Sequence, residues 1–425
     1  MQNPFRQLFR CSAGSNGDGN AGAVRVCPLR GIGVIYRRFG KTGLEVPVVS
    51  AGFMRAMHSW GQVPAADIPA AGQANLEEIV CRALELGINH FETARGYGTS
   101  EEQLGRALKR IARRDSYLLQ TKIQPTDDPA AFRADFLDSL QRLGIARVDL
   151  LALHGINDYR NLWRSCRPGG CLAAARDLQR QGLTGCIGFS GHGSLPVILA
   201  ALRHEADGGF DYLNLHWYYI CQVNTPALIE AAAREMGVFI ISPTDKGGML
   251  QAPPARLLEL CRPLSPMAFN DLYCLARNEV STISVGAARP TDFDAHVEAV
   301  SRLGLQGDLL REIDSRCRQA MKETCGHERP EGLWSLLPSW DLTPGLINIP
   351  FILWLHNLAR GWGLAAYARK RYTHLGRDVK WVPGNNAAAV RQYDLDRIAE
   401  KAGLPGETLT LLLAEAHGFL GRTGA

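Results

Sequence analysis

The stretch "SYLLQTKIQPTDDPAAFRADFLDSLQRLGIARVDLLALH", residues 116–154, carries two strand patterns separated by a helix pattern. Its ends, 116–122 and 148–154, are apolar runs of strand length. The segment between them, 130–144, has apolar residues at helical spacing and ends on a glycine, which favours a helix that stops there. Two strands joined by a helix are typical of a parallel βαβ unit. The stretch therefore predicts a parallel sheet covered by helices.

The same alternation extends to both sides of this stretch. Strand-like runs lie at 46–53, 89–94, 116–122, 148–154, 184–191, 212–219, 238–245 and 281–287. Amphipathic segments lie between most of them, such as 75–87 and 225–237. Eight strands alternating with helices favour an α/β fold of the (β/α)₈ TIM barrel type over an open sheet. We expect the barrel to occupy residues 34–305.

The composition favours a globular protein that binds a small molecule. The chain has 425 residues, of which 46% are hydrophobic, and 47 Lys and Arg stand against 42 Asp and Glu. The basic residues are scattered, which argues against a nucleic-acid partner. The most apolar stretch, 346–355, is too short to span a bilayer and contains a proline. Eleven cysteines without a CxxC pair are typical of reduced thiols, so we expect a cytoplasmic protein without a membrane segment.

Residues 1–33 lack helical or strand periodicity and are rich in Gly, Ala, Asn and Arg. We expect a disordered tail. Its four arginines and its shortage of acids also fit an organelle transit peptide, although serines are few. A further alternative is that the protein begins near Val34 and the tail is spurious.

Two short motifs point to other enzyme classes but lack the required context. "GWGLAA" at 361–366 follows no strand, so it is a weak dinucleotide fingerprint. "GFSGH" at 188–192 lacks the closing glycine of a nucleophile elbow. Neither a Rossmann domain nor a serine hydrolase is favoured.

Barrel enzymes carry their chemistry at the carboxyl ends of the strands. Successive predicted strands deliver Glu92, Lys122 and His154 to that end, and Tyr97 follows Glu92 in a glycine-flanked turn. Four titratable groups converging from three successive strands predict an active site there. No set of residues with metal-ligand spacing accompanies them, so we expect no metal site.

From about Tyr36 to Leu303 the chain resembles the aldo-keto reductase superfamily. "YRRFGKTGLEVPVVSAGFM" is similar to its N-terminal hairpin and first strand, and "FETARGYG" followed by "EEQLGRAL" is similar to its signature, with Glu92 in place of the usual Asp. "TKIQ", "VDLLALH", "GFSGH", "FDYLNLHWYY" and "ISPTDKGGML" follow in the order of that family.

The resemblance implies a catalytic tetrad of Tyr97, Lys122, His154 and Glu92. Tyr97 would be the general acid for a carbonyl oxygen while a nicotinamide delivers hydride, and Lys122 would lower the pKa of the phenol. His154 would orient the carbonyl. Glu92, one methylene longer than the usual Asp, would hold Lys122.

The resemblance also implies a set of cofactor-binding residues. Ser190 and Asn214 would hold the nicotinamide carboxamide, and Trp217 would stack on the ring. The pyrophosphate would lie along 242–248, with Ser242, Lys246 and Gly247 lining it.

The adenosine end would lie near Gly286 and Arg289, in the turn before the last barrel helix. Arg289 suits a 2′-phosphate but could equally be a surface cap, and the family's usual Glu and Asn fall on Ala295 and His296. We therefore expect NADPH, with NADH as the alternative.

Beyond residue 305 the chain resembles the C-terminal portion of a subgroup with a ferredoxin-like [4Fe–4S] appendage. The cluster cysteines of that subgroup are missing, because Cys317 and Cys325 are the only cysteines after residue 305. We expect residues 306–425 to be a degenerate, mainly helical appendage without a cluster, packed through its tryptophans. The alternative is a docking surface for a protein partner or a second subunit.

Two functions follow from these patterns. The first is an NADPH-dependent oxidoreductase that reduces an aldehyde or ketone. The second is a barrel that binds a nicotinamide nucleotide as a sensor or scaffold, with Glu92 and the lost cluster as signs of drift. The intact Tyr97, Lys122 and His154 favour the first.

Overall fold

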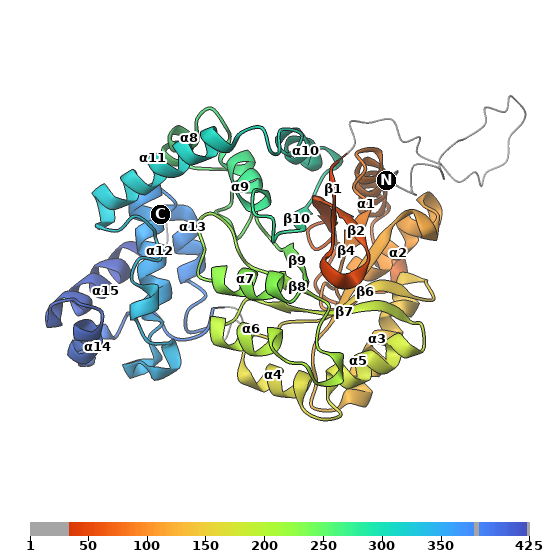
Figure 1. Ribbon diagram of the computed structural model, residues 1–425, viewed down its shortest axis with the longest axis horizontal. Helices are drawn as coiled ribbons and strands as arrows, with labels where there is room; N and C mark the ends of the chain where they lie inside the picture. Colours follow the sequence, from red (N-terminus) through yellow and green to blue (C-terminus); the bar gives the residue numbers. More distant parts are fainter. Residues whose placement is uncertain (1–33, 378–381, 423–425) are drawn as a thin grey trace, which may run out of the picture.

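The predicted barrel is present in the computed structural model, which describes residues 34–377 and 382–422 (Figure 1). Eight parallel strands pair in chain order, and β10 closes the ring by pairing with both β9 and β3. The strands are β3 (Val49–Gly52), β4 (His90–Glu92), β5 (Leu118–Ile123), β6 (Val148–Leu153), β7 (Thr184–Gly191), β8 (Tyr212–Leu215), β9 (Gly237–Ile240) and β10 (Thr282–Gly286).

Helices surround the ring of strands (Figure 1). Those of the barrel region are α1 (Ala70–Glu85), α2 (Ser100–Ile111), α3 (Pro129–Leu143), α4 (Tyr159–Cys166), α5 (Cys171–Arg180), α6 (Leu195–Leu202), α7 (Thr225–Ala233), α8 (Ala255–Cys261), α9 (Pro266–Leu275) and α10 (Asp294–Val300).

Helix α3 shows why the segment between β5 and β6 is helical. Asp128 caps its start by accepting the Ala130 N–H at 2.9 Å, and Pro129 occupies the first turn. Phe132 and Phe136, one turn apart, are both fully buried. Gly144 ends the helix with a φ of 63°, a conformation that glycine adopts without strain.

One expected strand is divided in two by the structure. The run 46–53 splits at Val48, so that β2 (Glu45–Pro47) forms an antiparallel hairpin with β1 (Tyr36–Arg38) and only β3 enters the barrel. The turn after β1 buries Phe39 against Tyr212, with ring centroids 5.4 Å apart. The hairpin therefore closes the amino-terminal end of the barrel, and the carboxyl ends of the strands are left for a ligand.

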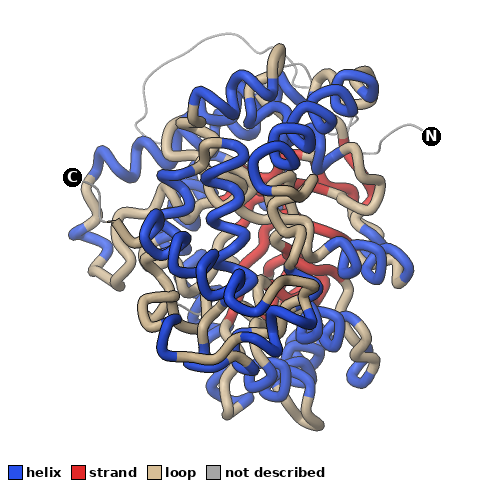
Figure 2. Tube along the Cα trace, turned by 90° about the vertical axis from the view of Figure 1, so that its left-hand side faces the viewer, coloured by secondary structure: helices blue, strands red, loops and turns tan. Residues whose placement is uncertain are grey.

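In the described part of the chain, five more α-helices follow the barrel, coloured from cyan to blue in Figure 1. They are α11 (Gly307–Cys325), α12 (Ile349–Trp362), α13 (Ala365–Tyr372), α14 (Asp396–Lys401) and α15 (Gly406–Leu420). Figure 2, viewed from this side, shows helices lying in front of the strands. We call residues 306–425 the appendage; that its boundary is a domain boundary stays a prediction.

The appendage packs on the segment that follows β8. Trp362 is fully buried and stacks on Tyr219 at 5.2 Å between ring centroids, and the Trp354 indole N–H donates to the Ile220 carbonyl at 2.7 Å. None of the helices in the described part of the chain is both long and apolar enough to cross a membrane. The expected disordered tail, 1–33, lies outside the described residues.

Candidate active site

The structure brings the four residues of the tetrad together at the carboxyl ends of the strands. Glu92 ends β4, Lys122 lies near the end of β5 and His154 directly follows β6. Tyr97 lies in the turn between β4 and α2. Parallel strands deliver these side chains to one rim because their carboxyl ends meet there.

Lys122 and Glu92 form a buried ion pair between neighbouring strands. The Lys122 ammonium also donates to the Thr93 carbonyl at 2.8 Å. Burial lowers the pKa of Lys122 well below its usual value, since water no longer solvates the charge. The Glu92 carboxylate opposes that shift, and loss of either partner would leave an uncompensated buried charge.

The longer glutamate is accommodated by a small neighbour. Its second carboxylate oxygen accepts a long hydrogen bond from Ser284 Oγ at 3.4 Å. It also lies over Gly52 in β3, where an added Cβ would come within 3.1 Å of Glu92 Oε2. The absent side chain at Gly52 therefore leaves the space that the extra methylene of Glu92 needs.

Tyr97 is surrounded by the other members of the site. Its ring lies edge-on to His154 at 5.7 Å and to the exposed Trp60 at 6.5 Å between ring centroids. The Lys122 ammonium lies 4.7 Å from the centroid of the Tyr97 ring. Burial raises the pKa of Tyr97 above its usual value of 10, which is opposite to the lowering expected from Lys122. Tyr97 therefore carries its proton at neutral pH, as a proton donor must.

The turn that carries Tyr97 depends on a glycine. Gly98 has a φ of 48°, and a Cβ there would lie 1.8 Å from the Ser59 carbonyl oxygen. The Thr99 N–H donates to the same carbonyl at 3.0 Å. The segment around Ser59 is thus fastened to the turn, which fixes Trp60 beside Tyr97.

Ser190 and Asn214 lie side by side on β7 and β8, as paired residues of the two strands. Ser190 Oγ accepts the Gly155 N–H at 2.9 Å. Asn214 is fully buried, and neither its side-chain oxygen nor its nitrogen has a hydrogen-bond partner among the described residues. An unsatisfied buried amide costs free energy, so this side chain fits a ligand that carries a complementary amide. The carboxamide of a nicotinamide has that chemistry.

Trp217 lies just past β8 and packs on a neighbouring helix. Its indole is 1% exposed and stacks on Tyr273 of α9, with 5.5 Å between centroids and 15° between planes. The indole N–H donates to Thr225 Oγ1 at 3.0 Å. The structure thus packs Trp217 against α9, and its stacking on a nicotinamide stays a prediction.

The loop after β9 is tightly folded. Ser242 has a φ of 57°, and a Cβ at Gly247 would lie 1.7 Å from the Pro243 carbonyl oxygen, so only glycine fits there. The Lys246 ammonium lies 3.2 Å from His216 Nε2. Burial and the nearby Arg371 lower the pKa of Lys246 to about 7. The side chain of Lys246 therefore contacts His216, which directly follows β8.

His192 and His216 at the rim were not expected to belong to the site. Their imidazoles stack at 4.8 Å between centroids with 25° between planes. His192 lies two residues after Ser190, and His216 lies two residues after Asn214. Both histidines directly follow their strands, where strand alternation no longer fixes the direction of a side chain, so the sequence pattern could not have placed them together.

The residues expected at the adenosine end lie at the end of β10 and in the turn after it. The Gly286 carbonyl accepts from Arg55 Nη1 at 3.2 Å. The Arg289 side chain is 76% exposed and pairs with Asp292 at 3.2 Å, in the position of a helix cap. His296 forms a buried pair with Asp271. A 2′-phosphate at Arg289 would compete with the Asp292 carboxylate.

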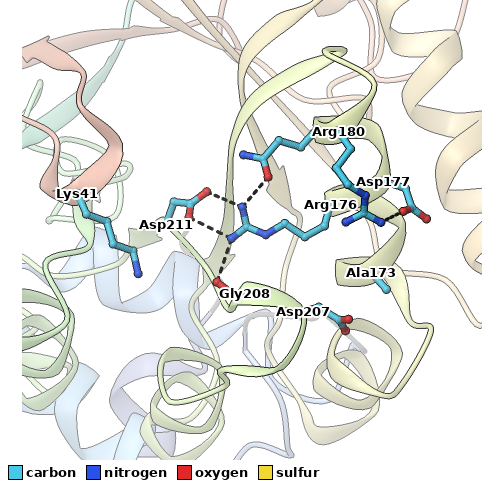
Figure 3. A pocket seen from close by; sticks show the side chains of 9 residues that line it. Lys41, Ala173, Arg176, Asp177, Arg180, Asp207, Gly208 and Asp211 are labelled. Carbon is cyan, nitrogen blue, oxygen red and sulfur yellow. Dashed lines mark hydrogen bonds and ion pairs between the residues drawn. The ribbon is translucent and has the colours of Figure 1, made fainter.

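A separate pocket of about 570 Å³ lies at the other end of the barrel (Figure 3). Arg176 spans it with two hydrogen bonds of 3.0 Å to Asp211, which precedes β8. Its other charged residues include Lys41, Asp177 and Asp207. Positive and negative groups are balanced there, and the tetrad is at the opposite strand ends. In the described ranges, no group of three or more His, Cys, Asp or Glu side chains is arranged to hold a metal ion.

Comparison with known proteins agrees with this architecture. Residues 55–255 match the model of the aldo/keto reductase family. The chain is 27% identical over 312 residues to L-galactose dehydrogenase of Arabidopsis thaliana, which covers 66% of this chain and 93% of that protein. It is 31% identical over 138 residues to L-glyceraldehyde 3-phosphate reductase of Escherichia coli, 29% of this chain and 37% of that protein.

A solved structure supports the assignment of the barrel fold. The holo form of an aldo-keto reductase from Bacillus halodurans has a TM-score of 0.56 and 22% sequence identity, and the match covers 67% of this chain and 96% of that one. It is also a parallel eight-stranded barrel surrounded by helices, and this chain adds the C-terminal helices. With these matches and this barrel, the chain belongs to the aldo/keto reductase family, a family of NAD(P)-dependent oxidoreductases.

Proposed function

We propose that the chain is an NADPH-dependent reductase of a small aldehyde or ketone, with Tyr97 as the general acid. One observation carries the proposal: Tyr97, His154 and the Lys122–Glu92 pair meet at one rim, beside a buried Asn214 amide without a partner in the described structure. A proton donor, a carbonyl-orienting group and a place for a carboxamide are the parts that hydride reduction requires.

The proposed roles follow from the positions of the side chains. A reduced nicotinamide held by Ser190 and Asn214 would supply the hydride. His154 would donate a hydrogen bond to the carbonyl oxygen and hold it near Tyr97. Tyr97 would give its phenolic proton to that oxygen as negative charge develops there.

Lys122 and Glu92 would act through Tyr97 as positioning residues. The Lys122 ammonium, 4.7 Å from the ring centroid, stabilises the phenolate that remains when the proton leaves. Glu92 keeps the ammonium in place. Trp60, which is 65% exposed, would border the opening through which the substrate enters.

The names of the relatives support a small carbonyl compound or its alcohol as substrate. They include a dehydrogenase of L-galactose, a reductase of L-glyceraldehyde 3-phosphate and a methylglyoxal reductase. These differ in size and charge, so the shared feature is the carbonyl group. The preference for NADPH rests on Arg289, which can turn from Asp292 to a 2′-phosphate.

The test is the substitution Tyr97→Phe in the full chain, which removes the proton donor and retains the ring. We expect turnover of an aldehyde panel to fall by about 10² or more, while the Kd of NADPH, measured by cofactor fluorescence, keeps its value. Tyr159→Phe, at an exposed position on α4, is the matched control. Unchanged turnover in Tyr97→Phe would refute the assignment.

The same titration decides the alternative function. A sensor or scaffold would bind the nucleotide but show no turnover of any aldehyde or ketone in the wild-type chain. Tighter binding of NADH than of NADPH would overturn the cofactor preference alone.

A further inference from the structure

The turn 93–99, which carries Tyr97, contains a single Arg, Arg95, that reaches a neighbouring helix. The guanidinium of Arg95 pairs with two aspartates of α3. One of its nitrogens lies 3.0 Å from Asp135 Oδ1, and another donates to the Asp138 carboxylate. The two aspartates are three residues apart, so they lie on the same side of the helix. Arg95 therefore fastens the turn to α3 at two points.

The main chain of Arg95 is bonded to the neighbouring strand. Its N–H donates to the carbonyl of Lys122 on β5 at 3.1 Å. The ammonium of the same lysine lies 4.7 Å from the centroid of the Tyr97 ring. A shift of Arg95 would therefore change the position of Tyr97 relative to Lys122.

Other hydrogen bonds hold the end of the same turn. The Thr99 N–H donates to the Ser59 carbonyl at 3.0 Å, and the Gln62 side-chain amide donates to the Gly98 carbonyl at 2.8 Å. These bonds lie after Tyr97 in the chain, whereas the ion pairs of Arg95 lie before it. The phenol is thus carried between two fixed points.

The charges around Arg95 favour this attachment. The charged groups that face it are Asp135 and Asp138 on α3 and Glu101 on α2, and Arg142 pairs with Asp138 from the same helix. The Arg95 guanidinium holds the pKa of the Asp138 carboxyl below its usual value, so this partner is charged at neutral pH. Without Arg95, two carboxylates on one side of α3 would repel each other, and the turn would lose its link to the helix.

We propose that Arg95 is a positioning residue, which fixes the turn of Tyr97 against α3 and thereby sets the phenol beside Lys122. This inference rests on the proposed function and adds a residue to it. Catalysis is sensitive to displacements of about 1 Å at a reacting group. The side chain of Arg95 is directed to α3, so it acts on the proton transfer through the position of Tyr97.

The first test is Arg95→Met in the full chain, which removes the charge and retains a long side chain. We expect kcat for an aldehyde to fall about 10-fold, because the proton donor is displaced, while KM and the Kd of NADPH stay within about 2-fold. Arg180→Met is the matched control, since it breaks an Arg–Asp pair on α5 at the other end of the barrel. A kcat of Arg95→Met equal to that of the control would overturn the inference.

A stability measurement distinguishes positioning from a general structural role. The Arg95 side chain is 25% exposed, and ion pairs that water reaches contribute little to stability. The urea midpoint of Arg95→Met should therefore match that of Arg180→Met. Arg95→Lys keeps the charge without the two-sided fork and should recover part of kcat. A lowered urea midpoint in Arg95→Met, together with no recovery of kcat in Arg95→Lys, would overturn the inference.

A double-mutant cycle tests the route through α3. In a chain that already carries Asp135→Asn and Asp138→Asn, the partners of Arg95 have lost their charge. Arg95→Met should then lower kcat by less than about 3-fold, because the interactions it removes are already broken. A loss as large as in the wild-type background would show that Arg95 does not act through these aspartates.

Hydrogen exchange separates this inference from the proposed function. Arg95→Met should speed amide exchange in residues 94–98 relative to the wild type and to Arg180→Met, whether or not the chain reduces an aldehyde. Faster exchange, with no turnover of any aldehyde or ketone by the wild type, would refute the function and keep Arg95 as the residue that fixes the turn. Turnover by the wild type, with unchanged exchange in Arg95→Met, would keep the function and overturn the inference.

Discussion

At the scale of single residues, the replacement of aspartate by Glu92 is compensated in its surroundings. The carboxylate reaches Lys122, and its second oxygen occupies space that Gly52 leaves open beside Ser284. Both charges are buried, so neither can exchange its partner for water. The pair thus depends on a carboxylate, and less on the length of the side chain that carries it.

Glu92→Gln should slow turnover by about 10-fold or more, because a neutral amide cannot hold the ammonium of Lys122. The pKa of Lys122, already lowered by burial, should fall further, and the loss of its charge should move the apparent pKa of the acid upward. Glu92→Asp is the matched control and should retain activity or raise it. The measurement is kcat as a function of pH for the wild type, Glu92→Gln and Glu92→Asp. A pH profile of Glu92→Gln equal to that of the wild type would show that the Glu92 carboxylate does not take part in catalysis.

The sequence indicated the tetrad because each member lies at or next to the end of a predicted strand. It could not indicate that Trp217 packs on Tyr273 of α9, since a residue just past a strand follows no alternation that a pattern can fix. His192 and His216 were present in the quoted motifs, but their stacking depends on the distance between β7 and β8. On these two strands, Ser190 and Asn214 were predicted to bind the same carboxamide, and they are paired in register.

At the scale of elements, α13 acts on the loop after β9. The Tyr367 hydroxyl binds the Lys246 carbonyl, Arg371 binds Asp245, and a Cβ at Gly248 would lie 3.4 Å from Leu364. The loop itself was quoted from the sequence as the pyrophosphate segment. Its contact with a helix more than 120 residues later could not be predicted, because nothing in either segment specifies the other.

Tyr367→Phe should loosen this loop without opening the barrel. Removing one buried hydrogen bond of about 1 kcal/mol should speed amide hydrogen exchange in residues 244–250 and raise the Kd of NADPH about 3- to 10-fold. Tyr159→Phe on α4 is the control, since its ring is 63% exposed. Exchange rates that match the wild type in this loop would show that α13 does not hold it.

At the scale of the whole molecule, the appendage and the barrel share one hydrophobic core. The ring of Trp362 lies at the joint, stacked on Tyr219 from the segment after β8, and its indole N–H donates to the Cys317 carbonyl of α11 at 2.9 Å. The sequence predicted that tryptophans pack the appendage, and two of them contact the barrel's β8 segment. The appendage therefore packs on the segment that directly follows β8 and begins at His216.

Trp362→Ala should lower the free energy of unfolding in urea by about 3–5 kcal/mol, because it leaves a cavity between barrel and appendage and removes the ring that stacks on Tyr219. Trp163→Ala is the control: that ring is 56% exposed and contacts Arg167 at 4.8 Å, an interaction of about 0.5–1 kcal/mol. Since Tyr219 follows β8, the Trp362 variant should also weaken NADPH binding at temperatures where it is still folded. A loss of stability no larger than that of Trp163→Ala would mean that the appendage packs on the barrel without stabilising it.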